Sequence, residues 1–273
     1  MSLISTLRAA IRIPLLALAT LIPLPIMFVG RAVGFLGARR VSSKICHFAI
    51  RGWARSCLAI MGVDLRVAGE APAPPFFLVS NHLSYLDIVV LHATCRARFL
   101  SKLEIAHWPV AGWLARLAGT LFIDRTQRRD VARAIPELRD ALAAGDGVII
   151  FPEGTSSAGS LVLPFHASLL QVPISLDMPT HWASLAYKTP EGSQPAFWSV
   201  CWWGDMPFAS HFLKLLTLPR IQADLDFGAP PVEAGDRKAL AAALHGAVTS
   251  RFRPSAPPHV AESPAHDPHT ASL

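Results

Sequence analysis

The chain has 273 residues, enough for one globular domain with extra segments, and carries a formal net charge of +6. With 52% hydrophobic and only 16% charged residues, and a mean hydropathy of +0.38, it is unlike an ordinary soluble protein and indicates contact with a membrane. Four widely separated cysteines with no C-x-x-C pair argue against a disulfide framework or a zinc site and fit a reducing compartment.

The positive charge is concentrated at the N-terminus. Eight basic residues and no acidic residue precede Asp64, which leaves 17 Lys and Arg against 19 Asp and Glu, a net of about −2, in the remainder. A basic patch suits either nucleic acid or anionic lipid, and here the basic residues flank apolar runs. We therefore expect an anionic membrane surface as a partner, and no nucleic acid.

Residues 13–30, IPLLALATLIPLPIMFVG, contain no charge. As a helix they would span roughly 27 Å, just short of a comfortable bilayer crossing. Pro23 and Pro25 would kink or break that helix. The segment therefore predicts a re-entrant or interfacial anchor first, and a membrane span second. A cleaved signal sequence and a buried core helix remain as further alternatives.

Residues 41–62, VSSKICHFAIRGWARSCLAIMG, follow a helical pattern with one narrow polar stripe. A cationic amphipathic helix that carries a Trp is typical of a membrane surface. The alternative is a helix packed on its own domain with a solvated basic edge. We expect residues 1–62 to form a helical membrane-associating arm. The residues of the stripe are Lys44, His47, Arg51 and Arg55.

After a Pro-rich connector at 68–75, apolar strand-like runs alternate with helical patterns. This alternation predicts an α/β domain over residues 63–253, with a largely parallel central sheet flanked by helices. The last residues, 254–273, are rich in proline and predict a disordered tail. The strand-like runs are 76–80, 98–101, 120–124, 147–151, 171–176, 182–188, 198–203 and 220–227. The helical patterns are 86–95, 109–119, 129–145, 205–216 and 236–252.

The stretch NHLSYLD, residues 81–87, follows a buried strand. Ser84 and Asp87 match a helix capping box, which needs no catalytic role. His82 has no such explanation, and it stands at a strand end, where open α/β sheets bind ligands. If His82 lies in the turn and Asp87 in the first helical turn, the carboxylate can orient the imidazole. The imidazole is then a general base toward a hydroxyl.

A second polar stretch, FPEGTSS at 151–157, also follows an apolar strand. Gly154 and Thr155 offer backbone N–H groups to an oxyanion or a phosphate. Ser156 suggests a serine hydrolase, but GTSSA lacks the final glycine of G-x-S-x-G. The residues therefore do not indicate an acyl intermediate on the protein.

These stretches resemble the conserved blocks of the glycerolipid acyltransferase superfamily, whose best-known members are the 1-acylglycerol-3-phosphate acyltransferases. NHLSYLD matches the N-H-x₄-D motif and FPEGTSS resembles the F-P-E-G-T-[RS]-S block. GTLFIDR (119–125) and VPI (172–174) resemble two further blocks, so the likeness covers about residues 76–230. It implies an α/β enzyme that moves a fatty acyl group from a thioester to a lyso-lipid hydroxyl. The expected place is the cytoplasmic face of the inner membrane.

Carried over by position, the resemblance makes His82 the general base and Asp87 the residue that orients it. It implies no metal and no cofactor beyond the co-substrate, which is acyl-CoA or acyl-ACP; acyl carrier protein is thus a further expected partner. Arg125 would meet an acceptor anion, and Glu153 would line the acceptor site with Gly154 and Thr155. The full expected substrate-binding set is Asn81, Arg125, Glu153, Gly154, Thr155 and Ser156.

Ser156 departs from the phosphate-accepting members, which usually carry Arg there. A hydroxyl cannot replace the bidentate grip of Arg on phosphate. The wider stretch resembles bacterial enzymes that acylate lyso-ornithine lipid, an acceptor without a glycerol phosphate. We expect 1-acyl-sn-glycerol-3-phosphate as the acceptor first, with lyso-ornithine lipid as the alternative. A non-catalytic lipid-binding protein and an acyl-thioester hydrolase are the other classes left open.

Overall fold

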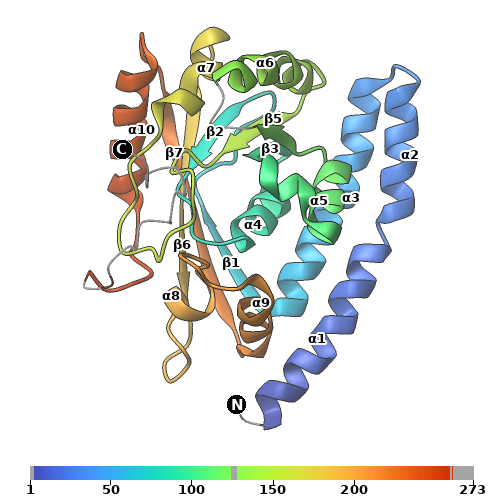
Figure 1. The fold of residues 1–273 in the computed structure, drawn as a ribbon, viewed down its shortest axis with the longest axis vertical. Coiled ribbons are helices and arrows are strands. Elements are labelled where there is room, and N and C mark those ends of the chain that lie inside the picture. Colours follow the sequence, from blue (N-terminus) through green and yellow to red (C-terminus); the bar gives the residue numbers. More distant parts are fainter. Residues whose placement is uncertain (1–2, 124–127, 259, 261–273) are drawn as a thin grey trace.

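The computed structural model describes residues 3–123, 128–258 and 260. Seven strands form one sheet in the order β1-β7-β6-β2-β5-β3-β4. Every neighbouring pair is parallel except β6 and β7. The expected α/β architecture with a largely parallel sheet is therefore confirmed (Figure 1). The strands are β1 (Val63–Ala68), β2 (Phe77–Ser80), β3 (Ala97–Lys102), β4 (Leu121–Ile123), β5 (Gly147–Ile150), β6 (Thr180–Lys188) and β7 (Ile221–Val232).

Helices cover both faces of the sheet. Successive side chains of β2 alternate between the layers, so that Leu78 packs with α3, α4 and α9, whereas Phe77 and Val79 pack with α6, α7 and α10. The bounds of these helices are α3 (Arg39–Met61), α4 (Leu86–Thr94), α6 (Arg128–Ala143), α7 (Gln171–Ser175), α9 (Phe208–Thr217) and α10 (Arg237–Arg251). The remaining body helices are α5 (Pro109–Ala118), α8 (Ala196–Ser199) and the 3₁₀ turns Leu103–His107 and Ala167–Leu170.

Two of the strands assigned from sequence were wrong, and one strand was missed. The run 171–176 is not a strand but the short helix α7, and Pro173 explains the error because proline cannot donate to a central strand ladder. The run 198–203 begins in α8 and continues as irregular chain. Short apolar runs do not distinguish strand from helix by periodicity. Strand β1 was missed, since it follows α3 directly and its last three residues are exposed.

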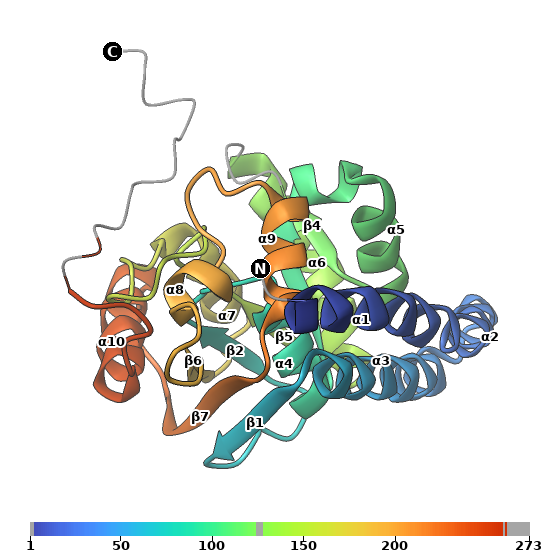
Figure 2. The ribbon, with the colours of Figure 1, turned by 90° about the horizontal axis from the view of Figure 1, so that it is seen from below.

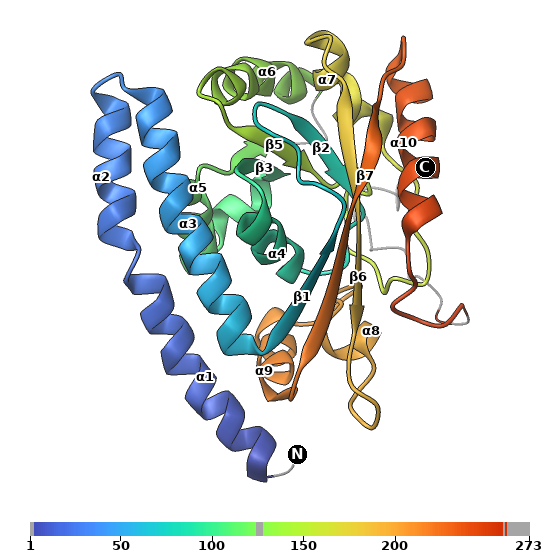
Figure 3. The same cartoon turned by 180° about the vertical axis from the view of Figure 1, so that it is seen from behind.

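The N-terminal segment forms two helices, α1 (Leu3–Leu21) and α2 (Leu24–Phe35), with the break at Pro23. They run along α3 at one side of the body (Figure 3). Together, residues 3–35 are the one described stretch long and apolar enough to cross a membrane. Many large apolar side chains of α1 and α2 are exposed, which is compatible with membrane association. Among them are Leu3, Leu7, Leu18, Phe28 and Phe35.

The arginines of this segment bind the body. Arg12 is buried and donates to the carbonyls of Leu216 and Leu218 at 3.0 and 2.6 Å, where α9 ends. Arg31 donates to the carbonyl of Leu117 at 2.6 Å, in the last turn of α5. Arg51 of α3 donates to the carbonyl of Ala93 at 3.1 Å, in the last turn of α4. Cations at helix C-termini satisfy orphan carbonyls and complement the helix dipole.

For Arg12, which is buried, the expectation that the basic residues of the arm meet anionic lipid was therefore wrong. Arg31 and Arg51 are partly buried and also bind protein carbonyls. The expected polar stripe of α3 is likewise divided. Lys44 and Arg55 are exposed, whereas His47 and Arg51 face the body. The alternative that α3 packs on its own domain holds for half of the stripe, and α3 lies between the N-terminal helices and α4 (Figure 2).

The start of the expected tail packs on the body. Ser255 donates its backbone N–H to the carbonyl of Gly159 at 2.8 Å, and its hydroxyl accepts from the backbone N–H of Tyr187 at 2.9 Å. Ala256 is buried. The ordered body thus extends past residue 253, and residues 261–273 of the expected tail lie outside the described residues.

Candidate active site

His82 and Asp87 meet as their spacing predicts. The chain turns after β2, and α4 begins at Leu86, which places Asp87 in its first turn. The Nδ1 atom of His82 lies 2.7 Å from Oδ2 of Asp87. Because a carboxylate only accepts, Nδ1 carries the proton. The other ring nitrogen, Nε2, therefore keeps the lone pair that can accept a proton from a hydroxyl.

The carboxylate of Asp87 is fully buried and fully engaged. Its Oδ2 also accepts from the backbone N–H groups of Leu83 and Ser84 at 2.7 and 3.0 Å. Its Oδ1 accepts from the hydroxyl of Tyr187, on β6, at 2.6 Å. A buried carboxylate needs such partners to remain charged. The capping box and the catalytic interpretation therefore hold together. The hydroxyl of Ser84 accepts from the backbone N–H of Leu86 at 3.3 Å, where α4 begins, and Asp87 both accepts from the N–H of Ser84 and holds the imidazole.

The imidazole of His82 is held from a second side by an aromatic ring. It stacks on Phe151, with 4.1 Å between ring centroids and 10° between the ring planes. The side chain of His82 remains 20% exposed, unlike Asp87. Its carbonyl accepts from the backbone N–H of Ser157 at 3.0 Å. Asp87 and Phe151 thus fix the orientation of the imidazole, and the side chain stays partly exposed, so that a substrate can reach it.

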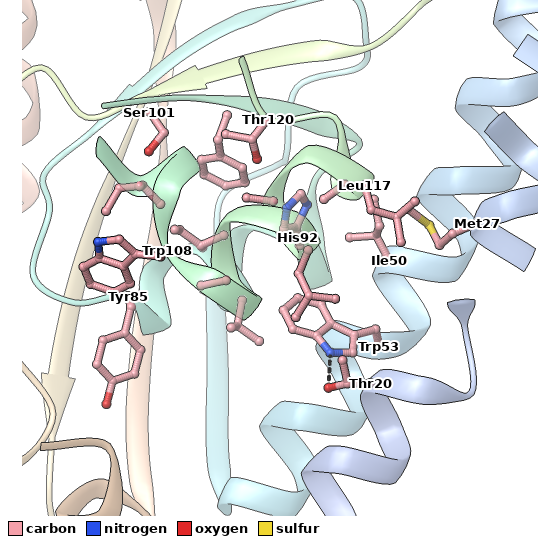
Figure 4. Close-up of a pocket in the computed structure, with 18 of the residues that line it drawn as sticks. Thr20, Met27, Ile50, Trp53, Tyr85, His92, Ser101, Trp108, Leu117 and Thr120 are labelled. Atoms are coloured by element: carbon pink, nitrogen blue, oxygen red, sulfur yellow. Dashed lines mark hydrogen bonds between the residues drawn. The ribbon is translucent and has the colours of Figure 1, made fainter. Parts of the chain in front are cut away.

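His82 lies where two cavities join. The larger, of about 390 Å³, is lined almost wholly by apolar side chains of α2, α3, α4 and α5 (Figure 4). The smaller, of about 230 Å³, is lined by the stretch from Gly154 to Ser156 and by Lys102 and Trp202. Both cavities share His82, Ile88, Phe99, Ser101, Ile105 and Trp202. An apolar chain and a polar head group can therefore reach the same imidazole from two sides.

The loop after β5 serves partly as a support for this site. Glu153 is buried, and its carboxylate accepts from the backbone N–H groups of His82 at 2.9 Å and Leu163 at 3.3 Å. The N–H of Gly154 donates to the carbonyl of Phe151 at 3.1 Å, so that in this conformation it turns the chain and does not point to a ligand. Gly154 has a φ of +77°, which favours glycine.

Two expected substrate-binding residues point elsewhere. The amide of Asn81 is fully buried and exchanges hydrogen bonds with the backbone of Leu185 at 2.9 and 2.7 Å, which ties the end of β2 to β6. Neither Asn81 nor Glu153 is among the described residues that line the two cavities. Ser156 does line the smaller cavity, and its hydroxyl donates a short hydrogen bond to the carbonyl of Trp202. Arg125 lies outside the described residues.

Sequence reasoning missed the residues that come from distant segments. Tyr187 lies a hundred positions from Asp87, and no local pattern pairs them. Lys102 ends β3 and brings a positive charge to the smaller cavity. In the sequence, only its position at the end of a predicted strand could have indicated that Lys102 lies at the site. Trp202 lines both cavities, although its run was assigned to a strand.

Comparisons with known proteins identify the family of this chain. Residues 64–185 match a family model described as Acyltransferase. A lyso-ornithine lipid O-acyltransferase of Rhodobacter capsulatus is 41% identical over 228 residues, which cover 78% of this chain and 82% of that protein. A 1-acyl-sn-glycerol-3-phosphate acyltransferase of Neisseria gonorrhoeae is 31% identical over 196 residues, which cover 70% of this chain and 76% of that protein.

The crystal structure of the 1-acyl-sn-glycerophosphate acyltransferase PlsC from Thermotoga maritima has the same fold. Its TM-score is 0.58 at 21% identity, and the match covers 89% of this chain and 97% of that chain. The sequence matches extend over more than two thirds of both chains at more than 30% identity. The resemblance seen in its motifs is therefore confirmed: the chain is an enzyme of the acyltransferase family that acts on lyso-lipids.

Proposed function

We propose that this acyltransferase uses lyso-ornithine lipid as its acceptor and His82 as its general base. The observation that carries the mechanism is the 2.7 Å contact between His82 and Asp87 at the junction of the two cavities. The acyl chain of the thioester would occupy the larger, apolar cavity. The head group of the acceptor would enter the smaller cavity, beside Lys102 and Trp202.

The chemistry follows from the charge state of the imidazole. Nε2 of His82 takes the proton from the acceptor hydroxyl, and the hydroxyl oxygen attacks the thioester carbonyl. Asp87 stabilises the imidazolium that forms, because its carboxylate already holds the opposite nitrogen. When the C–S bond breaks, the imidazolium returns its proton to the departing thiolate. The acyl group thus passes directly from the thioester to the acceptor hydroxyl, without an acyl-enzyme intermediate.

The acceptor proposed here differs from the one expected from the sequence. The sequence put 1-acyl-sn-glycerol-3-phosphate ahead of lyso-ornithine lipid. The hydroxyl of Ser156 donates a hydrogen bond to the carbonyl of Trp202 and so supports the cavity wall. Phosphate-accepting members of the superfamily that the motifs resemble usually carry Arg at this position. The relative with 41% identity bears the name lyso-ornithine lipid O-acyltransferase. Both observations support an acceptor without a phosphate.

A second acceptor keeps a specific observation in its favour. Lys102 lines the smaller cavity, and an ammonium group can bind a phosphate as a point charge. The relative from Neisseria gonorrhoeae is named for the phosphate acceptor. Lysophosphatidic acid is therefore the competing substrate, and Arg125 would be its further contact.

The apolar surface of the arm supports a membrane setting for the reaction. The exposed apolar side chains of α1 and α2 would rest in the inner membrane, with the body on its cytoplasmic face. Residues 1–62 would thus serve as the membrane-associating part. The donor would be acyl-CoA or acyl-ACP, and both present the same thioester to His82. No metal ion or further cofactor enters this mechanism.

The deciding experiment supplies purified full-length enzyme with an acyl thioester and either lyso-ornithine lipid or lysophosphatidic acid. Product mass and free thiol release are measured side by side. We expect diacylated ornithine lipid at the higher kcat/KM. A higher kcat/KM with lysophosphatidic acid would reverse the order of acceptors. Thiol release without any acceptor would indicate a hydrolase, and no release with any acceptor would support a lipid-binding protein.

A further inference from the structure

His92 is a polar residue at the apolar end of the larger cavity. It lies on the face of α4 that also carries Ile88 and Val89, and all three line the cavity. Residues four apart lie on one face of a helix, which explains the pairing of Ile88 and His92. At 1.5 Å per residue, His92 lies roughly 9 Å further along α4 than its first residue, Leu86. It is therefore separated along α4 from the turn that carries His82, where the thioester carbonyl would react.

The imidazole of His92 is buried with one of its two nitrogens unpartnered. The residue is 3% exposed, and its Nδ1 has no hydrogen-bond partner among the described residues. Burial, with a smaller effect from His47, lowers the pKa of His92 to about 3. The ring is therefore neutral at physiological pH, with one N–H donor and one lone pair. Such a group suits a hydroxyl, which both donates and accepts, and does not suit an anion.

The cavity lining around His92 is mostly apolar, and His47 of α3 is the polar residue near enough to affect its pKa. Its ring meets Phe99 edge to face, with 4.7 Å between centroids. Met27, Ile50 and Leu117 are among its neighbours in the cavity lining (Figure 4). An unsatisfied buried polar group costs about 1–3 kcal/mol, and a plain hydrocarbon chain cannot satisfy it. A cavity that bound only an unsubstituted hydrocarbon chain would be more stable with leucine at position 92, which buries no unsatisfied polar group.

We propose that His92 binds a hydroxyl carried by the acyl chain of the thioester donor, so that the enzyme selects hydroxyacyl over unsubstituted acyl groups. This inference depends on the proposed function, because it takes the larger cavity as the site of the donor chain. The hydroxyl would lie several carbons from the thioester, as His92 lies along α4 from the dyad. Hydrogen bonding at this point would fix both the depth and the register of the chain.

The experiment uses the full chain in lipid nanodiscs. Hexadecanoyl-CoA is compared with a series of hydroxyhexadecanoyl-CoA donors that carry the hydroxyl at successive carbons. The quantity measured is the ratio of kcat/KM for the hydroxylated donor to that for the plain donor. We expect a ratio of about ten at one position and near one at the others. His92→Leu should bring the ratio at that position to about one, whereas His92→Gln, which keeps a donor and an acceptor, should retain part of it.

Ile50→Leu is the matched control, since it changes the cavity lining without adding or removing a polar group. Its ratio should remain that of the wild type. Equal use of plain and hydroxylated donors at every position by the wild type would overturn the inference. So would a ratio that survives in His92→Leu. Either result would leave His92 with a bound water or a structural role, while acyl transfer from the plain donor would still support the proposed function.

A binding measurement separates the two proposals if turnover fails. His82→Ala protein is titrated with the plain and the hydroxylated thioester, and the two dissociation constants are compared. Tighter binding of the hydroxylated donor, lost on adding His92→Leu, supports the inference without any catalysis. Equal binding of the two donors overturns it. The absence of transfer in the wild type, by contrast, contradicts only the proposed function.

Discussion

Tyr187 donates a hydrogen bond to Oδ1 of Asp87 at 2.6 Å, while His82 contacts the other oxygen of the same carboxylate. The hydroxyl is fully buried, and burial raises the pKa of Tyr187 well above its ordinary value, with a further contribution from Asp87. Tyr187 is therefore a protonated donor throughout the working pH range. It acts on the reaction only through Asp87, as a positioning residue.

Removal of that donor should leave Asp87 less firmly positioned, although the contact between His82 and Asp87 remains. Tyr187→Phe is expected to lower kcat by roughly tenfold, because a hydrogen bond to a charged group contributes about 1.5–3 kcal/mol. With one donor fewer, the carboxylate attracts the imidazolium more strongly. The acidic limb of the pH–rate profile should therefore move to higher pH. Tyr85→Phe removes a partly buried hydroxyl that contacts His211 instead, and it should leave that limb in place.

Replacement of the proposed base gives the most direct test of the mechanism. His82→Ala should lower kcat by at least about 10²-fold, the low end for loss of a general base. Folding should be retained, as checked by circular dichroism and membrane sedimentation, because Leu83, Ser84 and Tyr187 still hold the carboxylate of Asp87 when the imidazole is removed. Near-normal turnover in this variant would remove His82 from the mechanism. Asp87→Ala should cost both activity and stability, since Leu83 and Ser84 would lose their acceptor.

The buried arginine of α1 should matter for stability and not for lipid attraction. Arg12→Ala leaves two carbonyls at the end of α9 without a donor, and should destabilise the fold by about 1–3 kcal/mol. The exposed Arg55→Ala removes the same charge from the arm and should have almost no effect on the melting temperature. Equal melting temperatures for the two variants would contradict the docking of α1 on α9. Thermal unfolding in detergent distinguishes these outcomes.

Deletion of residues 1–62 should make the protein insoluble or release it from membranes. The deletion removes Met27, Ile50 and Trp53 from the wall of the larger cavity and uncovers the end of α9. We expect aggregation and loss of acyl transfer, measured after fractionation of cell lysates. Tight membrane binding of residues 63–273 alone would show that the body, and not the arm, carries the membrane contact.

Two buried histidines should make the fold sensitive to mild acid. Burial, aided by Arg51, lowers the pKa of His47 to about 4, and the pKa of His92 is about 3. Since an unfolded histidine has a pKa near 6.5, the unfolded state binds protons first as the pH falls. The free energy of unfolding should therefore decrease below about pH 6.5, by up to about 1.4 kcal/mol per pH unit for each group, until about pH 4 for His47 and 3 for His92.

Denaturation at a series of pH values checks this sign. His92→Leu should flatten the dependence between pH 4 and 6.5, whatever its effect on absolute stability. His107→Leu removes an exposed imidazole and should leave the slope unchanged. A slope that is the same in His92→Leu and in the wild type would mean that the buried imidazole is charged, or that water reaches it.

The sequence by itself determined the features that depend on short segments. The five-residue step from His82 to Asp87 is enough to bring a turn residue and a first-turn residue together, and the structure places them 2.7 Å apart. Alternating apolar and helical runs predicted the α/β fold, and proline marked the break between α1 and α2. These features follow from local backbone geometry and periodicity, which the order of residues contains directly.

Only the tertiary structure decided which distant group each of these residues meets. In the folded protein Tyr187 donates to Asp87, Arg12 donates to a carbonyl at the end of α9, and the amide of Asn81 bonds to the backbone of Leu185. The tertiary structure also leaves Nδ1 of His92 without a partner among the described residues, inside an apolar cavity. The reason is physical: the type of a residue limits what it can donate or accept, but long-range packing of the sheet and helices decides which partner lies within reach and which charge is removed from water.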